Sequence, residues 1–122
     1  MLDARTLGLL RDALRNERER LIVEIGEYER EAKETLSDVS GENNYRDHMA
    51  DQGSATFARE LDMTLEGNAK EALEAVDAAL ARIEFGDYGT CVRCGEQIRL
   101  ERLEAVPAAD LCISCKEWEE SR

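Results

Sequence analysis

Apolar residues recur at three- and four-residue steps in two long stretches of the chain. This spacing places apolar side chains on one face of a helix and leaves charged residues on the other faces. The first stretch runs from about Asp3 to Val39 and the second from Phe57 to Ile83. Their apolar residues are Leu7, Leu10, Leu14, Leu21, Ile25, Tyr28, Ala32, Leu36 and Val39, then Phe57, Leu61, Leu65, Ala69, Leu73, Val76, Leu80 and Ile83.

The ends of these stretches carry helix start and stop signals. Asp3 is the expected N-cap of the first helix, and Asp51 or Ser54 that of the second. Gly86 is placed to end the second helix, because glycine readily adopts the backbone conformation that follows a helix. Between residues 40 and 53, turn-forming residues replace the periodic pattern. The sequence therefore predicts two long helices joined by a loop at about 40–53.

The two apolar faces match each other if the helices fold back as an antiparallel hairpin. One register pairs the apolar residues along both stretches: Leu10 with Ile83, Leu14 with Leu80, Leu21 with Leu73, Ile25 with Ala69, Ala32 with Leu61, and Leu36 with Phe57. Gly26 then falls roughly opposite Gly67, which allows either a close approach of the helices or a flexible point. Because such a hairpin covers its own apolar stripe, we expect a monomer.

All four cysteines lie in two C-x2-C motifs, Cys91–Cys94 and Cys112–Cys115, separated by 17 residues. This spacing is typical of a site in which four thiolates surround one Zn²⁺ ion. Four sulfur ligands leave no open position for water, so the zinc is expected to be structural and the protein not to be an enzyme. Two disulfides and a thiol-based redox sensor remain alternatives.

The charge balance restricts the partners and the compartment. The 122 residues carry a formal net charge of −12, and the cysteine-rich segment has no basic patch. Such a surface repels phosphate backbones, so we expect no direct DNA binding. The N-terminal residues do not resemble a secretory leader and no apolar run is long enough to cross a membrane, which favours a cytoplasmic protein with reduced thiols.

Shorter elements are expected around the cysteines. Residues 97–100 can form a short strand, residues 102–106 a turn or short helix, and residues 116–122 a terminal helix whose Trp118 packs on the zinc module or the hairpin base. The predicted fold is mainly α: an antiparallel coiled-coil hairpin over 1–86 and a four-cysteine zinc ribbon with a short terminal helix over 87–122.

Around the cysteines the chain reads Gly86-Asp87-Tyr88-Gly89-Thr90-Cys91-x-x-Cys94-Gly95, then Ile98, Arg102-Leu103-Glu104-Ala105, Pro107, Ala109 and Cys112-x-x-Cys115. This pattern resembles that of the DksA/TraR family of bacterial transcription regulators. The resemblance implies binding to RNA polymerase, with the coiled coil inserted into the secondary channel and its tip near the catalytic Mg²⁺. It also implies an effect on the lifetime of promoter complexes.

The resemblance places the polymerase-contacting tip at Asp47, His48, Met49, Ala50, Asp51 and Gly53. The proteobacterial pattern Asp-x-x-Asp-x-Ala reads here as His48-Met49-Ala50-Asp51-Gln52-Gly53, which is similar to a variant of Gram-positive relatives. The positions that match the guanosine tetraphosphate contacts of responsive members are Ala72, Ala75, Val106 and Lys116. Only the last is basic, so no nucleotide-binding site is expected and any effect on transcription should be largely independent of that nucleotide.

A second interpretation is an adaptor that binds another protein through its zinc ribbon and coiled coil, without a role at the polymerase active centre. Replacement of Asp51 distinguishes the two hypotheses, because an adaptor that binds through its sides does not depend on its tip.

Overall fold

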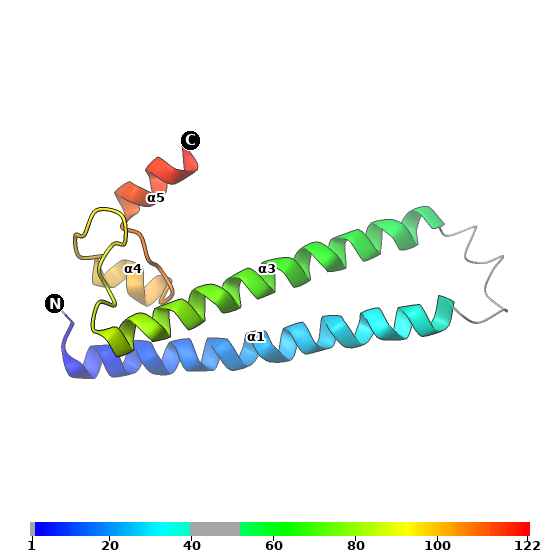
Figure 1. Ribbon diagram of the computed structural model, residues 1–122, viewed down its shortest axis with the longest axis horizontal. Coiled ribbons are helices and arrows are strands. Elements are labelled where there is room, and N and C mark those ends of the chain that lie inside the picture. The colour runs from blue at the N-terminus through cyan, green and yellow to red at the C-terminus, as the bar shows by residue number, and fades with distance from the viewer. Residues whose placement is uncertain (1, 40–51) are drawn as a thin grey trace. The chain divides into compact units, whose positions relative to one another are not determined.

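The computed structural model describes residues 2–39 and 52–122. Four helices follow one another along the described chain: α1 (Ala4–Val39), α3 (Gln52–Phe85), α4 (Leu100–Ala105) and α5 (Ile113–Glu120) (Figure 1). The described residues form no strand, and their one isolated β-bridge joins Thr90 and Gln97 in an antiparallel sense. The prediction of a mainly helical fold is confirmed.

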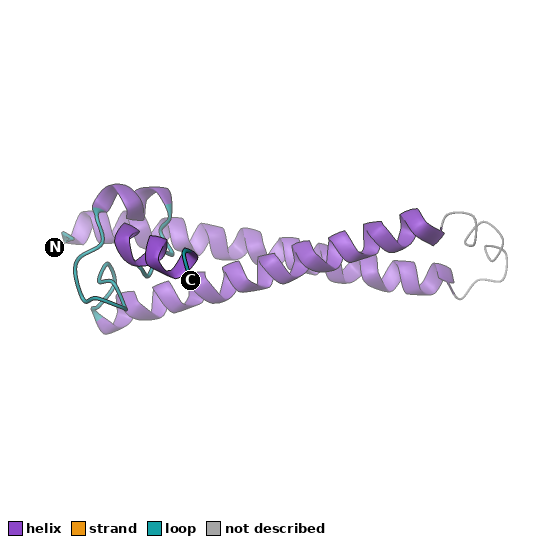
Figure 2. Cartoon of the chain, turned by 90° about the horizontal axis from the view of Figure 1, so that it is seen from above, coloured by secondary structure: helices purple, strands orange, loops and turns teal. Residues whose placement is uncertain are grey.

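Contacts divide the chain into two units. Unit 1 comprises Met1–Glu19 with Leu73–Arg122, and unit 2 comprises Arg20–Ala72. In each unit a stretch of α1 lies beside a stretch of α3 and runs in the opposite direction (Figures 1 and 2). The expected boundary between the hairpin (1–86) and the zinc module (87–122) divides the chain differently from these contact-based units, and it stays a prediction.

The N-terminal start of α1 follows the expected capping pattern. The backbone N–H of Thr6 donates to Asp3 Oδ1 at 2.7 Å, and the N–H of Leu7 donates to the Asp3 carbonyl at 2.9 Å. This contact favours the charged carboxylate and holds the pKa of Asp3 below its usual value. The prediction of Asp3 as the N-cap is confirmed.

The C-terminal end of α3 is also set by local sequence. Gly86 has φ +87°, and its N–H donates to the Ile83 carbonyl at 3.2 Å and to the Arg82 carbonyl at 2.9 Å. The N–H of Asp87 donates to the Arg82 carbonyl at 3.1 Å, which completes a Schellman motif. The start of α3 differs from expectation, because Ser54 lies inside the helix rather than at its cap. Asp51 lies outside the described residues.

The hairpin stretch of unit 1 has a closed apolar core. Leu10 and Leu14 from α1 and Val76 and Ala79 from α3 are all buried. Arg18 Nε donates to Asp77 Oδ1 at 2.7 Å on the surface, which links the two helices near the predicted register.

The hairpin stretch of unit 2 is more open than the sequence predicts. Phe57, Leu61 and Leu65 lie on the predicted contact stripe, yet 69%, 48% and 39% of their surfaces are exposed. Leu21 and Ala69 are buried, so the stripe is covered over only part of its length. The apolar spacing identifies a face, but burial also needs a second helix close enough to cover it. The expectation that the hairpin covers its whole apolar stripe, from which a monomer was inferred, is therefore wrong for these residues.

The two opposed glycines do not serve a close helix approach. A Cβ atom added at Gly26 or at Gly67 meets nothing within 4 Å. Of the two interpretations open from the sequence, the close approach is excluded.

Candidate zinc module

The two cysteine motifs form turns that direct all four sulfurs to one place. In the first turn the N–H of Gly95 donates to the Cys91 carbonyl at 2.9 Å, and the N–H of Cys91 donates to the Glu96 carbonyl at 2.8 Å. Gly95 has φ +78°, a conformation in which a side chain is strained. The second motif lies at the start of α5, where Cys112 is the N-cap and Cys115 is inside the first turn.

A small apolar core holds these turns in place. Tyr88, Ile98, Leu103, Ala109 and Leu111 are buried, and Leu103 is fully enclosed. The Tyr88 hydroxyl donates to the Pro107 carbonyl at 2.7 Å. Burial raises the pKa of the Tyr88 phenol, and the charge of nearby Arg82 partly opposes this shift. The phenol is thus a neutral donor that ties the chain after α3 to the turn that follows α4.

The connection between the two motifs contains a single β-bridge and a short helix where a strand was expected. Thr90 and Gln97 form a single bridge, the N–H of Ile98 donates to the Gly89 carbonyl at 2.8 Å, and α4 begins at Leu100. Arg99 is the N-cap of α4, with φ −61° and ψ 141°, so the extended segment ends where the helix begins at Leu100. The strand prediction for residues 97–100 is wrong, and the expected short helix before Pro107 is confirmed.

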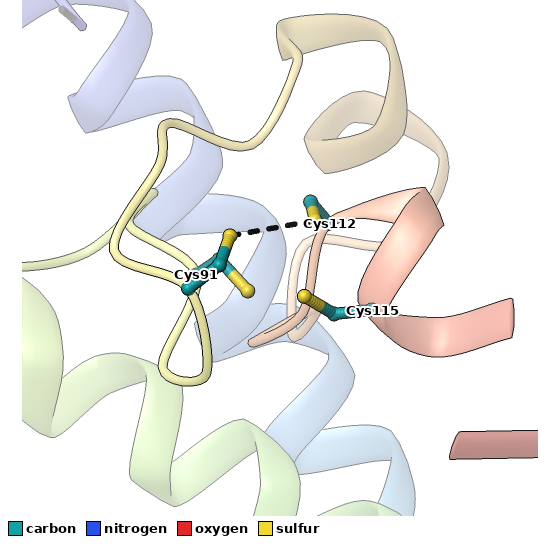
Figure 3. A group of neighbouring side chains, drawn as sticks. Cys91, Cys112 and Cys115 are labelled. Carbon is teal, nitrogen blue, oxygen red and sulfur yellow. Dashed lines mark hydrogen bonds between the residues drawn. The ribbon is translucent and has the colours of Figure 1, made fainter. Parts of the chain in front are cut away.

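The geometry of the sulfurs fits a tetrahedral zinc ion. The four Sγ atoms lie within 4.8 Å of one another, and those of Cys94 and Cys112 are 3.8 Å apart. A tetrahedron with Zn–S bonds of about 2.3 Å has sulfur–sulfur edges of about 3.8 Å. Figure 3 shows the side chains of Cys91, Cys112 and Cys115 converging on a common centre. All four cysteines are free thiols, so the disulfide alternative does not describe this arrangement.

The environments of Cys91 and Cys94 shift the pKa values of their thiols in opposite directions. Burial disfavours the Cys91 thiolate, but backbone N–H groups of Cys94, Cys112 and Arg93 outweigh burial and lower the pKa of Cys91 to about 6. The N–H of Glu96 favours the Cys94 thiolate, yet a hydrogen bond from the Cys94 thiol to the Cys91 sulfur, together with burial, raises the pKa of Cys94 to about 12. Four thiolates at this separation need a cation between them, and binding of that cation releases the remaining protons.

The fold and the site together define a class of protein: a two-helix hairpin with a closed four-cysteine zinc module. The sequence model of the prokaryotic dksA/traR C4-type zinc finger matches residues 86–120. The solved structure of transcription factor DksA2 from Pseudomonas aeruginosa is similar, with a TM-score of 0.78 and 34% identity over 98% of this chain and 87% of that one.

Curated relatives are similar over a shorter part of their own length. The RNA polymerase-binding transcription factor DksA of Caulobacter vibrioides is 36% identical over 93 residues, which cover 76% of this chain and 66% of the relative. General stress protein 16O of Bacillus subtilis is 37% identical over 90 residues, or 72% of this chain and 55% of the relative. The chain thus spans less than two thirds of the length of these relatives.

These similarities identify the family. The chain belongs to the DksA/TraR family, as its cysteine motifs predicted. The zinc-finger match and the clustered cysteines show that its cofactor is one structural zinc. Within the described residues, neither long helix has the apolar length needed to cross a membrane.

The expected tip lies largely outside the described residues. This applies to Asp47, His48, Met49, Ala50 and Asp51. Gly53 is described, and it is the second residue of α3 rather than part of the expected loop. Trp118 lies on α5, where the guanidinium of Arg93 stacks on its ring, so the prediction that it packs on the zinc module is confirmed. No pattern in the sequence identifies Arg93 as the partner of Trp118.

Proposed function

We propose that this protein is a regulator of transcription initiation that binds bacterial RNA polymerase through the secondary channel. The carrying observation is its similarity to transcription factor DksA2 along 98% of this chain, over both the helical hairpin and the zinc module. The Caulobacter relative is named as an RNA polymerase-binding transcription factor. As a transcription factor with a closed metal site, the protein performs no catalysis and acts in the cytoplasm.

The long helices suit a factor that reaches into a deep site. α1 has 36 residues and α3 has 34. At about 1.5 Å per residue, each helix is about 50 Å long. The net charge of −12 attracts the protein to basic protein surfaces and repels it from DNA. In this proposal the tip contacts the region of the polymerase active centre through Asp47, His48, Met49, Ala50, Asp51 and Gly53.

The zinc ion maintains the fold of the four-cysteine module. We assign one ligand each to Cys91, Cys94, Cys112 and Cys115, because their sulfurs lie within 4.8 Å of one another. A structural zinc site of this kind contributes about 10–16 kcal/mol of apparent binding free energy at neutral pH. The zinc is therefore a folding requirement of the module and takes no part in chemistry.

The surface around the expected nucleotide positions favours action without guanosine tetraphosphate. Ala72 and Ala75 lie on α3, and Val106 is the C-cap of α4, so none of them supplies a cation. Lys116 Nζ lies 3.9 Å from Glu119 Oε1 and 4.0 Å from Glu120 Oε1. The one basic residue of the set is thus paired with carboxylates, and a tetraphosphate would have to displace them.

Binding of the zinc-loaded protein to RNA polymerase core enzyme from the same organism tests the proposal. A Gre-type transcript-cleavage factor, which uses the secondary channel, serves as the competitor. We expect mutually exclusive binding, and Asp51→Asn should reduce the effect on promoter complexes more than it reduces binding. Simultaneous binding of both proteins would contradict the secondary-channel assignment. No binding by folded, zinc-loaded protein would contradict the polymerase as partner.

An adaptor function is the second candidate, and a groove in unit 2 favours it. The groove has a volume of about 320 Å³ and is lined by residues of both helices, among them Tyr28, Ala32, Asp62, Met63 and Glu66. A lining that combines apolar side chains with carboxylates and Arg59 is suited to binding another protein through the side of the hairpin. Met63→Glu should abolish binding by an adaptor that uses this groove, whereas Asp51→Asn should leave such binding unchanged.

A further inference from the structure

Arg93 joins the sulfur cluster to the terminal helix. It lies between the two cysteines of the first motif, and its side chain reaches the second. Its Nη1 donates to Cys115 Sγ at 3.5 Å, and its guanidinium carbon lies 3.6 Å from the centroid of the Trp118 ring. Neither Arg93 nor Trp118 belongs to the run of residues that carries the family resemblance. The contact thus joins two residues that the motif itself does not specify.

The chemistry of the three groups makes this contact favourable when zinc is bound. A zinc ion with four thiolate ligands carries a net charge of about −2, which a neighbouring cation stabilises. Arginine is always protonated, and its flat guanidinium donates to sulfur at its edge while its face stacks on an aromatic ring. Lys116, which lies on α5, forms ion pairs with Glu119 and Glu120. Arg93 thus has the direct contact with a cluster sulfur.

We propose that Arg93 is a positioning residue that couples zinc binding to the placement of α5. It compensates the charge of the thiolate cluster at Cys115 and holds Trp118 by cation–π stacking. Trp118 in turn keeps the guanidinium oriented toward the sulfur. The zinc-loaded cluster therefore fixes α5 against the first cysteine turn through a side chain as well as through its own ligands.

Zinc affinity provides the first test, measured on the full chain by competition with a chromophoric chelator under reducing conditions. Residues that orient or neutralise metal ligands typically contribute ten- to a hundredfold to affinity, so we expect Arg93→Gln to weaken zinc binding about tenfold. Arg93→Lys, which keeps the charge, should restore part of the loss. Arg99→Gln is the matched control, because it removes the same charge from the same module at an exposed position, and it should leave the affinity within about twofold.

A double-mutant cycle tests the role of Trp118. Exposed cation–π contacts are worth about 0.5–1 kcal/mol, so Trp118→Leu should weaken zinc binding about threefold. Because Trp118 acts through Arg93, the double variant should be no weaker than Arg93→Gln alone. The proposal would be overturned if the losses of zinc affinity in Arg93→Gln and Trp118→Leu multiplied in the double variant. It would also be overturned if Arg93→Gln lost no more affinity than Arg99→Gln.

Trp118 fluorescence supplies a readout that a purely structural role would not change. It is the single tryptophan of the chain, and 43% of its surface is exposed. In zinc-loaded Arg93→Gln we expect acrylamide to quench Trp118 more strongly than in the native protein. Arg122, whose guanidinium carbon lies 4.8 Å from the ring centroid, touches no described sulfur, so Arg122→Gln should raise quenching without lowering zinc affinity. Unchanged quenching in Arg93→Gln with the fold intact would also overturn the proposal.

Discussion

Replacing the two opposed helical glycines by alanine should make the hairpin more stable. Gly26 lies inside α1 and Gly67 inside α3, and a Cβ atom added at either meets nothing within 4 Å. Glycine in a helix interior is about 1 kcal/mol less favourable than alanine. The two gains should add, because neither new methyl group contacts the opposite helix, to give about 2 kcal/mol. This corresponds to about a thirtyfold shift toward the folded state.

The assay is urea unfolding of the zinc-loaded protein, followed by far-ultraviolet circular dichroism, for both single variants and the double variant. Gly89→Ala is the opposite control, because Gly89 has φ +89° and an added Cβ would lie 3.3 Å from Leu2 Cδ1. That backbone conformation costs about 1–2 kcal/mol with a side chain. Destabilisation by Gly26→Ala or Gly67→Ala would refute the reasoning, because it would require a neighbour near the new methyl group. If polymerase binding falls while stability rises, the flexible-point interpretation of the glycines is supported.

Three further perturbations have defined outcomes. Removal of zinc by a chelator should unfold the module, because metal binding supplies its folding free energy. Stronger quenching of Trp118 fluorescence by acrylamide would confirm the unfolding, and unchanged quenching would contradict it. Tyr88→Phe should destabilise the module by about 1 kcal/mol, because the Pro107 carbonyl loses its 2.7 Å donor in a partly buried setting, as thermal unfolding can measure. The pKa of Asp3 is lowered in the folded state, so its stabilisation is present above the unfolded pKa and is lost as pH falls through the folded value. An acid titration of helicity should therefore show a transition that Asp3→Asn lacks, and identical curves would contradict the cap's contribution.

Local signals explain how much of this fold the sequence predicts. The three- and four-residue apolar spacing and the cap at Asp3 predict α1, and Gly86 fixes the end of α3 at Phe85. The Asp3 and Gly86 signals act through hydrogen bonds within a few residues, and the apolar spacing shows which face of a helix can be buried, so the helix positions can be predicted without the tertiary structure. The cysteine cluster is predictable for a different reason, since two paired C-x2-C motifs are the spacing of four ligands to one zinc ion.

The errors arise where the outcome depends on a distant neighbour. Phe57, Leu61 and Leu65 have the spacing of core residues, but burial depends on how closely the partner helix approaches, which spacing does not encode. The stacking of Arg93 on Trp118 depends on where two separate turns bring their side chains. An arginine between two cysteines has the same sequence pattern whether it points to solvent or to a sulfur.

The contrast between the two units has a consequence for function. In unit 1 the contact stripe of the hairpin is covered, since Leu10, Leu14 and Val76 are buried. In unit 2 the same kind of spacing leaves Phe57 and Leu61 largely exposed, beside a groove with acidic residues in its lining. Sequence features that fail to produce a core are most often found where a protein must bind something else. A basic protein surface with apolar side chains would both cover these residues and neutralise the charge, which is the chemistry expected of a partner that encloses the hairpin from its sides.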